Sequence, residues 1–270
     1  MPLDISAEVL DNRRLSPDYS VLQLDAARIA QTALPGQFVM LKQSPGLEPL
    51  LRRPFSIFEI LRDSAGAPTG ISILNKRVGT ATRQIYDAER GHRISCLGPL
   101  GRPFSVAEAG GAAWMVAGGV GLAPFATLAE ALAARGTAMT LFYGGRSASD
   151  LYYIEFFESL GAEVVLATED GTRGAAGRIT GPLAEHLAAT APGAALSLFA
   201  CGPEPMLAAV ARLAAKHGRP CEVSVERVMG CGLGGCYSCV VPVRTEEGRE
   251  HFVRSCISGP VFDASRIVWD

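Results

Sequence analysis

The fold is decided by residues 114–124, which read WMVAGGVGLAP. Four apolar residues suited to a buried strand run into a glycine-rich loop, and Pro124 suits the first turn of a following helix. The loop carries G-x-G-x-x-P and not the dinucleotide fingerprint G-x-G-x-x-G. Its glycines still let a pyrophosphate approach the free N–H groups at a helix start. We therefore predict a nucleotide-binding loop with Gly119, Gly121 and Pro124 as candidate contacts; a tight turn without a ligand is the alternative.

Around this stretch, strand-like and helix-like segments alternate, which is typical of an α/β domain with a parallel sheet and right-handed crossovers. Cys201-Gly202-Pro203 follows the fourth strand-like run, so this loop and the glycine loop should face one crevice. The predicted strands are Trp114–Ala117, Met139–Tyr143, Val164–Ala167 and Leu196–Ala200, and the predicted helices are Pro124–Ala134, Leu151–Leu160, Gly181–Ala189 and Glu204–His217.

The first hundred residues have a different rhythm, with short apolar or alternating runs separated by Pro and Gly. Such spacing is typical of an antiparallel β-barrel or sandwich. The predicted strands are Glu8–Arg13, Ser20–Leu24, Phe38–Lys42, Ser56–Leu61, Ile71–Asn75 and Arg93–Leu97, and one helix is predicted at Thr82–Asp87.

Two segments of this barrel are candidates for a flavin. Arg53-Pro54-Phe55-Ser56 lies at a strand start, where an arginine fork suits a pyrophosphate and a serine can hydrogen-bond the flavin ring or its ribityl chain. An exposed arginine is the alternative. Gly79-Thr80-Ala81-Thr82 lies at a helix start, which favours a phosphate but equally suits a simple helix cap.

Cysteines give the most specific pattern in the chain. Of seven, Cys231, Cys236 and Cys239 form C-x4-C-x2-C, and Cys256 follows after a short β-like stretch. This is the spacing of plant-type [2Fe–2S] ligation, in which glycines let the backbone approach the cluster. Structural zinc normally pairs two C-x2-C knuckles, and only one is present, so zinc or buried thiols are the lesser alternatives. The tail of about fifty residues is too small for a large core, and a cluster would stabilise it.

Charge and composition exclude several function classes. The net charge of −2 offers no basic field for nucleic acid or an anionic membrane. The uncharged stretch 109–129 is long enough to span a bilayer, but its glycines and Pro124 favour a strand, a loop and a helix. The N-terminus lacks a signal-peptide pattern. A soluble, cytoplasmic protein is therefore expected.

The order of three motifs resembles the ferredoxin–NADP reductase superfamily. These motifs are R-P-F-S at 53–56, G-x-G-x-x-P at 119–124 and C-G-P at 201–203. The cysteine loop and the closing segment 256–262 look like the electron-transfer subunit of type B dihydroorotate dehydrogenase, so the resemblance covers the whole chain. It implies an FAD-binding antiparallel β-barrel domain (1–105), an NAD-binding α/β parallel-sheet domain (106–220) and a small β-rich [2Fe–2S] domain (221–270). The residues that it implies as FAD contacts are Arg53, Pro54, Phe55, Ser56, Leu74, Asn75, Lys76, Ala81 and Thr82.

Three residues depart from that family pattern. Asn75 stands where an aromatic residue is usual, Ala81 where Gly is usual, and Ser258 where Asp usually follows the last cysteine. The first two affect the expected FAD contacts. None of the three departures removes a residue on which the expectation of FAD or of the cluster depends.

The resemblance implies that electrons pass from a partner FMN subunit, which oxidises dihydroorotate to orotate, through the [2Fe–2S] cluster and FAD to NAD⁺. The expected assembly is a heterotetramer with two chains of each subunit, and this chain would contribute no catalytic residue for the pyrimidine. The alternatives are a reductase subunit for ferredoxin or sulfur compounds, a self-sufficient NAD(P)H reductase, and an iron–sulfur redox sensor. Arg146 suits a 2′-phosphate whereas Glu169 and Asp170 oppose one, and the resemblance favours NAD.

Overall fold

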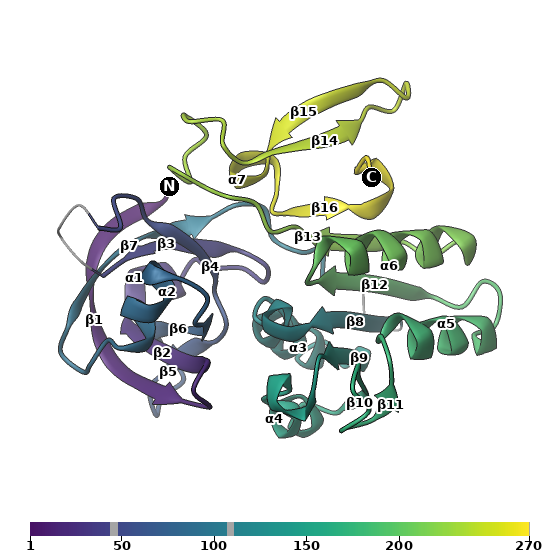
Figure 1. Cartoon of the computed structure of the whole chain (residues 1–270), viewed down its shortest axis with the longest axis horizontal. Helices are drawn as coiled ribbons and strands as arrows, with labels where there is room; N and C mark the ends of the chain where they lie inside the picture. The colour runs from purple at the N-terminus through teal and green to yellow at the C-terminus, as the bar shows by residue number, and fades with distance from the viewer. Residues whose placement is uncertain (44–47, 107–110, 270) are drawn as a thin grey trace.

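The first hundred residues form an antiparallel sheet that curls into a barrel (Figure 1). The computed structural model describes residues 1–43, 48–106 and 111–269. The strand order of this sheet is β4-β3-β7-β1-β2-β6-β5, so the predicted N-terminal barrel is confirmed. Its elements are β1 (Leu3–Arg14), β2 (Tyr19–Asp25), α1 (Ala27–Ala30), β3 (Phe38–Lys42), β4 (Arg53–Ser56), β5 (Ile60–Arg62), β6 (Pro68–Lys76), α2 (Thr80–Tyr86) and β7 (Arg93–Leu100).

One predicted barrel strand is wrong. The apolar run Ser56–Leu61 was expected to be a single strand, but β4 ends at Ser56 and β5 begins at Ile60. Between them Ile57 and Phe58 are buried, and the Phe58 amide donates to the carbonyl of Ser72. The chain changes strand partner here, from β3 to β6, which an apolar run by itself does not reveal.

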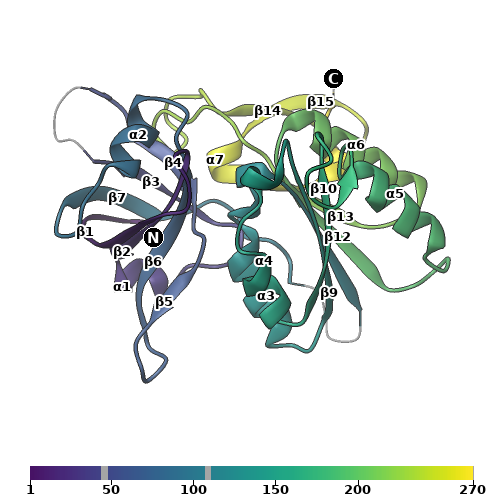
Figure 2. The ribbon, with the colours of Figure 1, turned by 60° about the horizontal axis from the view of Figure 1, so that its bottom comes forward.

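The second sheet is parallel except at one edge, with the order β11-β10-β9-β8-β12-β13-β16. The predicted α/β architecture is confirmed, and helices α3 to α6 cover the sheet (Figure 2). Its elements are β8 (Ala112–Gly118), η1 (Gly119–Leu122), α3 (Phe125–Ala133), β9 (Ala138–Gly145), η2 (Ala148–Asp150), α4 (Ile154–Ser159), β10 (Ala162–Thr168), β11 (Ala175–Ala176), α5 (Thr180–Ala189), β12 (Leu196–Cys201), α6 (Glu204–Lys216), β13 (Cys221–Ser224) and β16 (Val261–Asp263).

The order of strands reverses between β8 and β12. β8 pairs with β9 on one side and with β12 on the other, and all three strands run parallel. In open α/β sheets, ligands bind beyond the carboxyl ends of the strands at such a point. The glycine loop follows β8 and Cys201-Gly202-Pro203 follows β12, so the sheet brings both predicted loops to this point.

The cysteine-rich tail packs over both sheets. It contains the hairpin β14 (Val240–Arg244) and β15 (Glu250–Arg254), the short helix α7 (Ser255–Ser258) and η3 (Ala264–Arg266), and Figure 1 shows the hairpin above the two larger domains. β13 and β16 come from residues beyond 220 but extend the parallel sheet. The boundary at 220 stays a prediction.

Buried side chains join the three parts into one body. One core contains Tyr19 and Phe58 from the barrel together with Phe125 and Tyr143 from the nucleotide domain. A smaller core joins the barrel to the cysteine loop and consists of Phe38, Met40, Leu97, Leu100, Met229, Cys239 and Cys256. Of the helices within the described residues, none combines the length and apolar character needed to cross a membrane.

Candidate functional site

A cavity of about 1010 Å³ lies where the barrel, the parallel sheet and the cysteine loop meet. Each part contributes to its wall: Arg53 from β4, Pro124 from the start of α3, and Ser238 from the cysteine loop. Ligand pockets typically measure about 300–1,000 Å³, so the cavity is large enough for a dinucleotide-sized cofactor. The predicted contacts that line it are Arg53, Pro54, Phe55, Ser56, Leu74, Lys76, Ala81, Thr82, Pro124 and Cys201.

The two neighbouring arginines of the barrel motif point to different surroundings. Arg53 lines the cavity, and its guanidinium donates to the carbonyl oxygens of Leu51 and Arg52 at 2.9 and 3.2 Å. Arg52 instead forms an ion pair with Asp4 at 2.7 Å and also bonds Ser95. Only Arg53 is therefore available to a ligand in the cavity.

Asn75 and Thr82, which the sequence predicts as FAD contacts, also serve the barrel itself. Asn75 is fully buried, donates to the carbonyl oxygen of Thr82 at 3.0 Å, and leaves its own Oδ1 without a partner among the described residues. The hydroxyl of Thr82 accepts hydrogen bonds from the amides of Val78 and Gly79. Thr82 therefore closes the turn that shapes the cavity wall, and its contact with FAD stays a prediction.

The residues of this cavity fit FAD. Two cations, Arg53 and Lys76, suit a diphosphate, and the apolar side chains of Leu74 and Val120 suit a ring system. Of the predicted FAD contacts on β6, Leu74 and Lys76 line the cavity, whereas Asn75 between them is not among its lining residues. Because neighbouring residues of a strand point to opposite faces, the expected contact of Asn75 with FAD stays a prediction.

The glycine loop and the C-G-P loop touch each other, as predicted. A Cβ on Gly121 would lie 2.3 Å from the carbonyl oxygen of Cys201, and one on Gly118 would lie 2.8 Å from Cδ of Pro203. Gly119 has φ +55°, a conformation that favours glycine. The close approach therefore requires glycines for packing, and their predicted nucleotide contacts stay untested.

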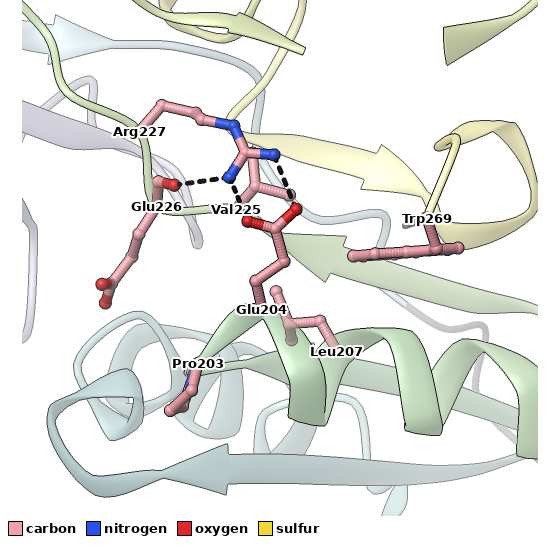
Figure 3. A pocket seen from close by; sticks show the side chains of 8 residues that line it. Pro203, Glu204, Leu207, Val225, Glu226, Arg227 and Trp269 are labelled. Carbon is pink, nitrogen blue, oxygen red and sulfur yellow. Dashed lines mark hydrogen bonds and ion pairs between the residues drawn. The ribbon is translucent and has the colours of Figure 1, made fainter. Parts of the chain in front are cut away.

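A second, smaller cavity of about 160 Å³, shown in Figure 3, shares Val225, Glu226 and Arg227 with the wall of the first. Arg227 crosses it to bond both carboxylate oxygens of Glu204 at 2.7 and 3.0 Å. The cavity is lined by Gly202, Pro203, Glu204, Leu207, Val225, Glu226, Arg227 and Trp269. Gly202 and Pro203 thus face this cavity, whereas Cys201 faces the larger one.

The four cysteines predicted as cluster ligands lie together as two pairs. After Ser238, Cys231 helps to lower the pKa of the Cys236 thiol, and after burial, Cys239 helps to raise the pKa of the Cys256 thiol, so the two thiols of each pair lie close together. Within the described residues no three His, Cys, Asp or Glu side chains converge around one point, as a single metal ion would require. Two adjacent pairs of thiols suit two irons, so the donor set fits a [2Fe–2S] cluster.

Glycine and serine shape the loop around these thiols. A Cβ on Gly230 would lie 3.1 Å from Sγ of Cys236, so glycine leaves space beside the sulfur. The amide of Leu233 donates to Sγ of Cys231 at 3.3 Å, and the Ser238 hydroxyl lies 3.2 Å from Sγ of Cys236. Hydrogen bonding to Ser238 lowers the pKa of the Cys236 thiol to about 6. Donors of this kind stabilise the negative charge of cluster thiolates.

The two pairs differ in burial, which gives the cysteine loop an inner and an outer side. Cys239 and Cys256 are buried against Met229, and Cys236 is exposed. Met229, Gly230 and Ser238 also line the flavin cavity. Both pairs therefore have a neighbour in the cavity wall: Met229 packs with the inner pair, and Ser238 lies beside the exposed Cys236 of the outer pair.

Glu226 is a site residue that the sequence reasoning missed. It lies two residues after β13, at the carboxyl edge of the sheet, and lines both cavities. In Figure 3 its carboxylate points away from the ion pair of Arg227. Burial of this carboxyl raises its pKa above the ordinary 4.5, and Lys76 opposes the shift. The sequence contained one indication of this role: Glu226 closely follows the strand after the C-G-P segment, and ligands bind beyond the carboxyl ends of parallel strands.

At the sheet edge, Arg146 and the acidic turn predicted to oppose a 2′-phosphate are neighbours. The amides of Glu169 and Asp170 donate to the carbonyl oxygens of Gly145 and Arg146, each at 3.1 Å. Arg146 also bonds the buried carboxylate of Asp150 at 3.1 Å. The two exposed acids thus stand beside one arginine that is already paired.

Comparison with protein families places two domains. Residues 115–212 match an oxidoreductase NAD-binding domain, and residues 226–268 match the iron–sulfur cluster binding domain of dihydroorotate dehydrogenase B. The chain is similar over its whole length to curated proteins described as "Dihydroorotate dehydrogenase B (NAD(+)), electron transfer subunit". That of Desulforamulus reducens is 34% identical, with 98% of both chains covered, and that of Geobacillus thermodenitrificans is 35% identical, with 96% of both covered.

Solved structures share the fold. One, from work on flavin-based electron bifurcation by NADH-dependent reduced ferredoxin–NADP oxidoreductase, is 25% identical with a TM-score of 0.83, covering 98% of this chain and 91% of the other. A ferredoxin reductase of carbazole 1,9a-dioxygenase is also 25% identical, with a TM-score of 0.69, and covers 81% of this chain and 67% of its own. The likeness extends through the barrel and the parallel sheet in order.

Proposed function

The chain belongs to the family of electron-transfer subunits of NAD⁺-dependent dihydroorotate dehydrogenase B, and we propose that it carries electrons between an FMN-containing partner subunit and NAD⁺. It is an oxidoreductase subunit with FAD, a [2Fe–2S] cluster and NAD as its redox groups. The partner would oxidise dihydroorotate to orotate in pyrimidine biosynthesis. We extend the proposal to a complex of two chains of each subunit in the cytoplasm, and the mass of the native complex tests this stoichiometry.

The observation that carries the proposal is the wall shared by the flavin cavity and the cluster thiols. Ser238 lines the cavity and its hydroxyl lies 3.2 Å from the cluster ligand Cys236. FAD exchanges hydride with a nicotinamide and also exchanges single electrons, whereas a [2Fe–2S] cluster takes electrons alone. A chain in which the two sites share a wall suits the passage of single electrons between them.

The outer side of the cysteine loop suits the partner subunit. Leu233, Tyr237 and Ile257 are large apolar side chains that remain exposed there, at 54%, 63% and 48%. A Cβ on Gly234 would lie 2.8 Å from Ile257, and the Arg254 guanidinium stacks on Tyr237, so these side chains surround one loop. Exposed apolar groups gathered beside a redox centre support docking of a partner over the outer thiol pair.

Hydride chemistry also requires a proton carrier in the flavin cavity. Oxidation of NADH yields NAD⁺, two electrons and one proton, and a cluster accepts the electrons only. Among the described residues that line the cavity, Glu226 is the only carboxylate. Burial raises the pKa of its carboxyl, so this group accepts a proton more readily than an ordinary glutamate does. In this proposal an Oε atom of Glu226 takes up the proton when electrons leave toward the cluster and returns it when they arrive.

Purification of the native complex and reconstitution from separate subunits test the function. The chain alone should contain about two irons and one FAD, reduce artificial dyes with NADH, and leave dihydroorotate unchanged. Addition of the FMN subunit should produce NAD⁺-linked orotate formation. Orotate formation by the chain alone, or no coupling in the reconstituted pair, would overturn the proposal. The match of the tail to the dihydroorotate dehydrogenase B domain does not favour the alternative of a reductase for ferredoxin or sulfur compounds.

A further inference from the structure

Asp150 is a buried carboxylate that receives groups from both large domains. It ends η2 in the nucleotide domain and is 5% exposed. The hydroxyl of Tyr19, on barrel strand β2, donates to its Oδ1 at 3.0 Å, and Nζ of Lys76, at the end of barrel strand β6, lies 3.6 Å from the same oxygen. On the nucleotide side, Nε and the amide of Arg146 donate to its Oδ2 at 3.1 and 3.3 Å.

The two cations bound by this carboxylate face two different sites. Lys76 lines the flavin cavity, and its ammonium lies 4.9 Å from the centre of the Tyr19 ring. Arg146 lies directly after β9 at the carboxyl edge of the sheet, and its side chain is 73% exposed. Among the described residues Arg146 pairs with Asp150 through Nε, so the two terminal nitrogens of its fork remain available to an anion.

The Tyr19 hydroxyl, which bonds this carboxylate, also lies close to the glycine loop. A Cβ on Gly119 would lie 3.7 Å from the Tyr19 hydroxyl, which is bonded to Asp150. The loop after β8, the flavin cavity and the edge after β9 are therefore connected through one anion. Burial alone would raise the pKa of Asp150, but Arg146, Lys76 and Tyr19 outweigh it and keep the pKa below the ordinary 3.8. The group is charged at neutral pH, and removal of its charge leaves two cations without their partner.

We propose that Asp150 is a positioning residue that fixes Lys76 against FAD and Arg146 against the phosphates of NAD(H). One buried charge thereby sets the geometry of the flavin site and of the nucleotide site. This role rests on the proposed FAD and NAD sites and adds to them a connection through this chain's own residues. A carboxylate that served only to pack the domains together would affect stability and neither ligand separately.

Four variants of the full chain separate positioning from packing. Asp150→Asn keeps the size of the side chain and removes its charge. Tyr19→Phe removes one hydrogen bond to the same carboxylate and leaves both cations paired, so it is the matched control. Lys76→Met and Arg146→Met remove one cation each. The measurements are the FAD dissociation constant of the flavin-free chain, by flavin fluorescence, and the KM and kcat for NADH with ferricyanide.

Asp150→Asn is expected to raise both the FAD dissociation constant and the KM for NADH about tenfold, with kcat nearly unchanged. Lys76→Met should raise only the first and Arg146→Met only the second. Asp150→Asn added to Lys76→Met should produce no further loss of FAD. The inference is overturned if Tyr19→Phe reproduces both effects, or if either cation variant leaves its own ligand unaffected. FAD binding and NADH oxidation by the unmodified chain test the proposed function independently. Unchanged constants in a folded Asp150→Asn also overturn the inference, and the cation variants can still overturn it if Asp150→Asn does not fold.

Discussion

The guanidinium of Arg227 donates two hydrogen bonds to the carboxylate of Glu204, of 2.7 and 3.0 Å (Figure 3). This pair connects the segment that leads to the cysteine loop with the first residue of α6. The next residues along this segment line the flavin cavity and then carry the first cluster thiol. A bidentate pair fixes orientation as well as distance. It therefore sets how the cluster segment lies over the flavin cavity.

Loss of this pair should slow the transfer of electrons to the cluster. Arg227→Ala is expected to lower stability by about 1 kcal/mol, since the pair is partly solvated. It should also slow cluster reduction by NADH about fivefold, the rate factor that corresponds to a barrier change of about 1 kcal/mol, with FAD reduction unchanged. Stopped-flow absorbance separates the two steps. Arg244→Ala, which breaks an exposed pair with Glu250 in the β14–β15 hairpin, is the control and should change neither.

The stability loss in Arg227→Ala should depend on pH in a defined direction. Hydrogen bonding from Arg227 lowers the pKa of Glu204 below the ordinary 4.5. A carboxyl with a lowered pKa in the folded state contributes stability above its unfolded pKa, and this contribution is lost as pH falls through the folded value. The difference in unfolding free energy between the variant and the parent should therefore be constant from pH 7 to about 5 and shrink in more acidic solution. A constant difference at all pH values would contradict the role of the charge.

Arg53 and Arg52 provide a matched pair for the flavin site. Arg53→Ala removes a cation from the cavity wall and should weaken FAD binding about tenfold, the usual effect of one charge-assisted contact. Arg52→Ala breaks the ion pair with Asp4 and the hydrogen bonds to Ser95, neither of which lines the cavity, and should leave the FAD dissociation constant within twofold. Fluorescence titration of the flavin-free chain measures both. Equal FAD affinity in the two variants would show that Arg53 is an exposed arginine that does not bind FAD.

Cys236 should be required for the cluster and not for the flavin. Cys236→Ser replaces an exposed cluster thiol, so iron and sulfide content should fall sharply while FAD remains bound. Cys221→Ala, which alters a buried thiol in β13 outside the loop, should retain both cofactors. Metal analysis of anaerobically prepared protein makes the comparison. Zinc in place of iron in the parent protein would reject the [2Fe–2S] interpretation.

Much of this architecture could be predicted because local pattern and local structure agree. β3 begins and ends at the predicted residues Phe38 and Lys42, and α6 differs from its prediction by one residue at its end. The glycine and C-G-P loops were predicted to meet, because parallel strands bring their carboxyl ends to one edge. The cysteine spacing predicted four cluster ligands, of which Cys239 and Cys256 share one buried core, and the ligation itself stays a prediction.

Contacts between distant parts of the chain could not be predicted. β16 joins the parallel sheet in antiparallel orientation, and nothing in Val261–Asp263 indicates this partner. Tyr19 and Asp150 are separated by 131 residues, and neither belongs to a motif. Glu226 is likewise a single carboxylate whose position over two cavities depends on the packing of the tail on both sheets. Motifs identify the residues that bind cofactors more readily than the residues that orient them.

The proton role of Glu226 can be separated from its effect on binding by the choice of electron acceptor. Reduction of two ferricyanide ions by NADH releases one proton, whereas transfer from NADH to thionicotinamide adenine dinucleotide moves a hydride and releases none. Glu226→Gln should therefore slow ferricyanide reduction by about 10²-fold, as expected for loss of a general base. Hydride transfer to the thionicotinamide should be nearly unchanged.

The pH dependence of the same reactions should identify the carboxyl directly. Because burial raises the pKa of Glu226 above 4.5, a growing fraction of the group is protonated as pH falls toward that raised value, and it then cannot accept a proton. The rate of ferricyanide reduction by the parent should therefore fall as pH falls toward the pKa of Glu226, and Glu226→Gln should not show this pH dependence. Glu226 should also affect stability. An acid whose pKa is raised by folding destabilises the folded state as pH rises through that raised pKa. Glu226→Gln should therefore be more stable than the parent at neutral pH, and this difference should disappear below about pH 4.5. Equal slowing of both acceptors would show that Glu226 acts in nicotinamide binding and not in proton transfer.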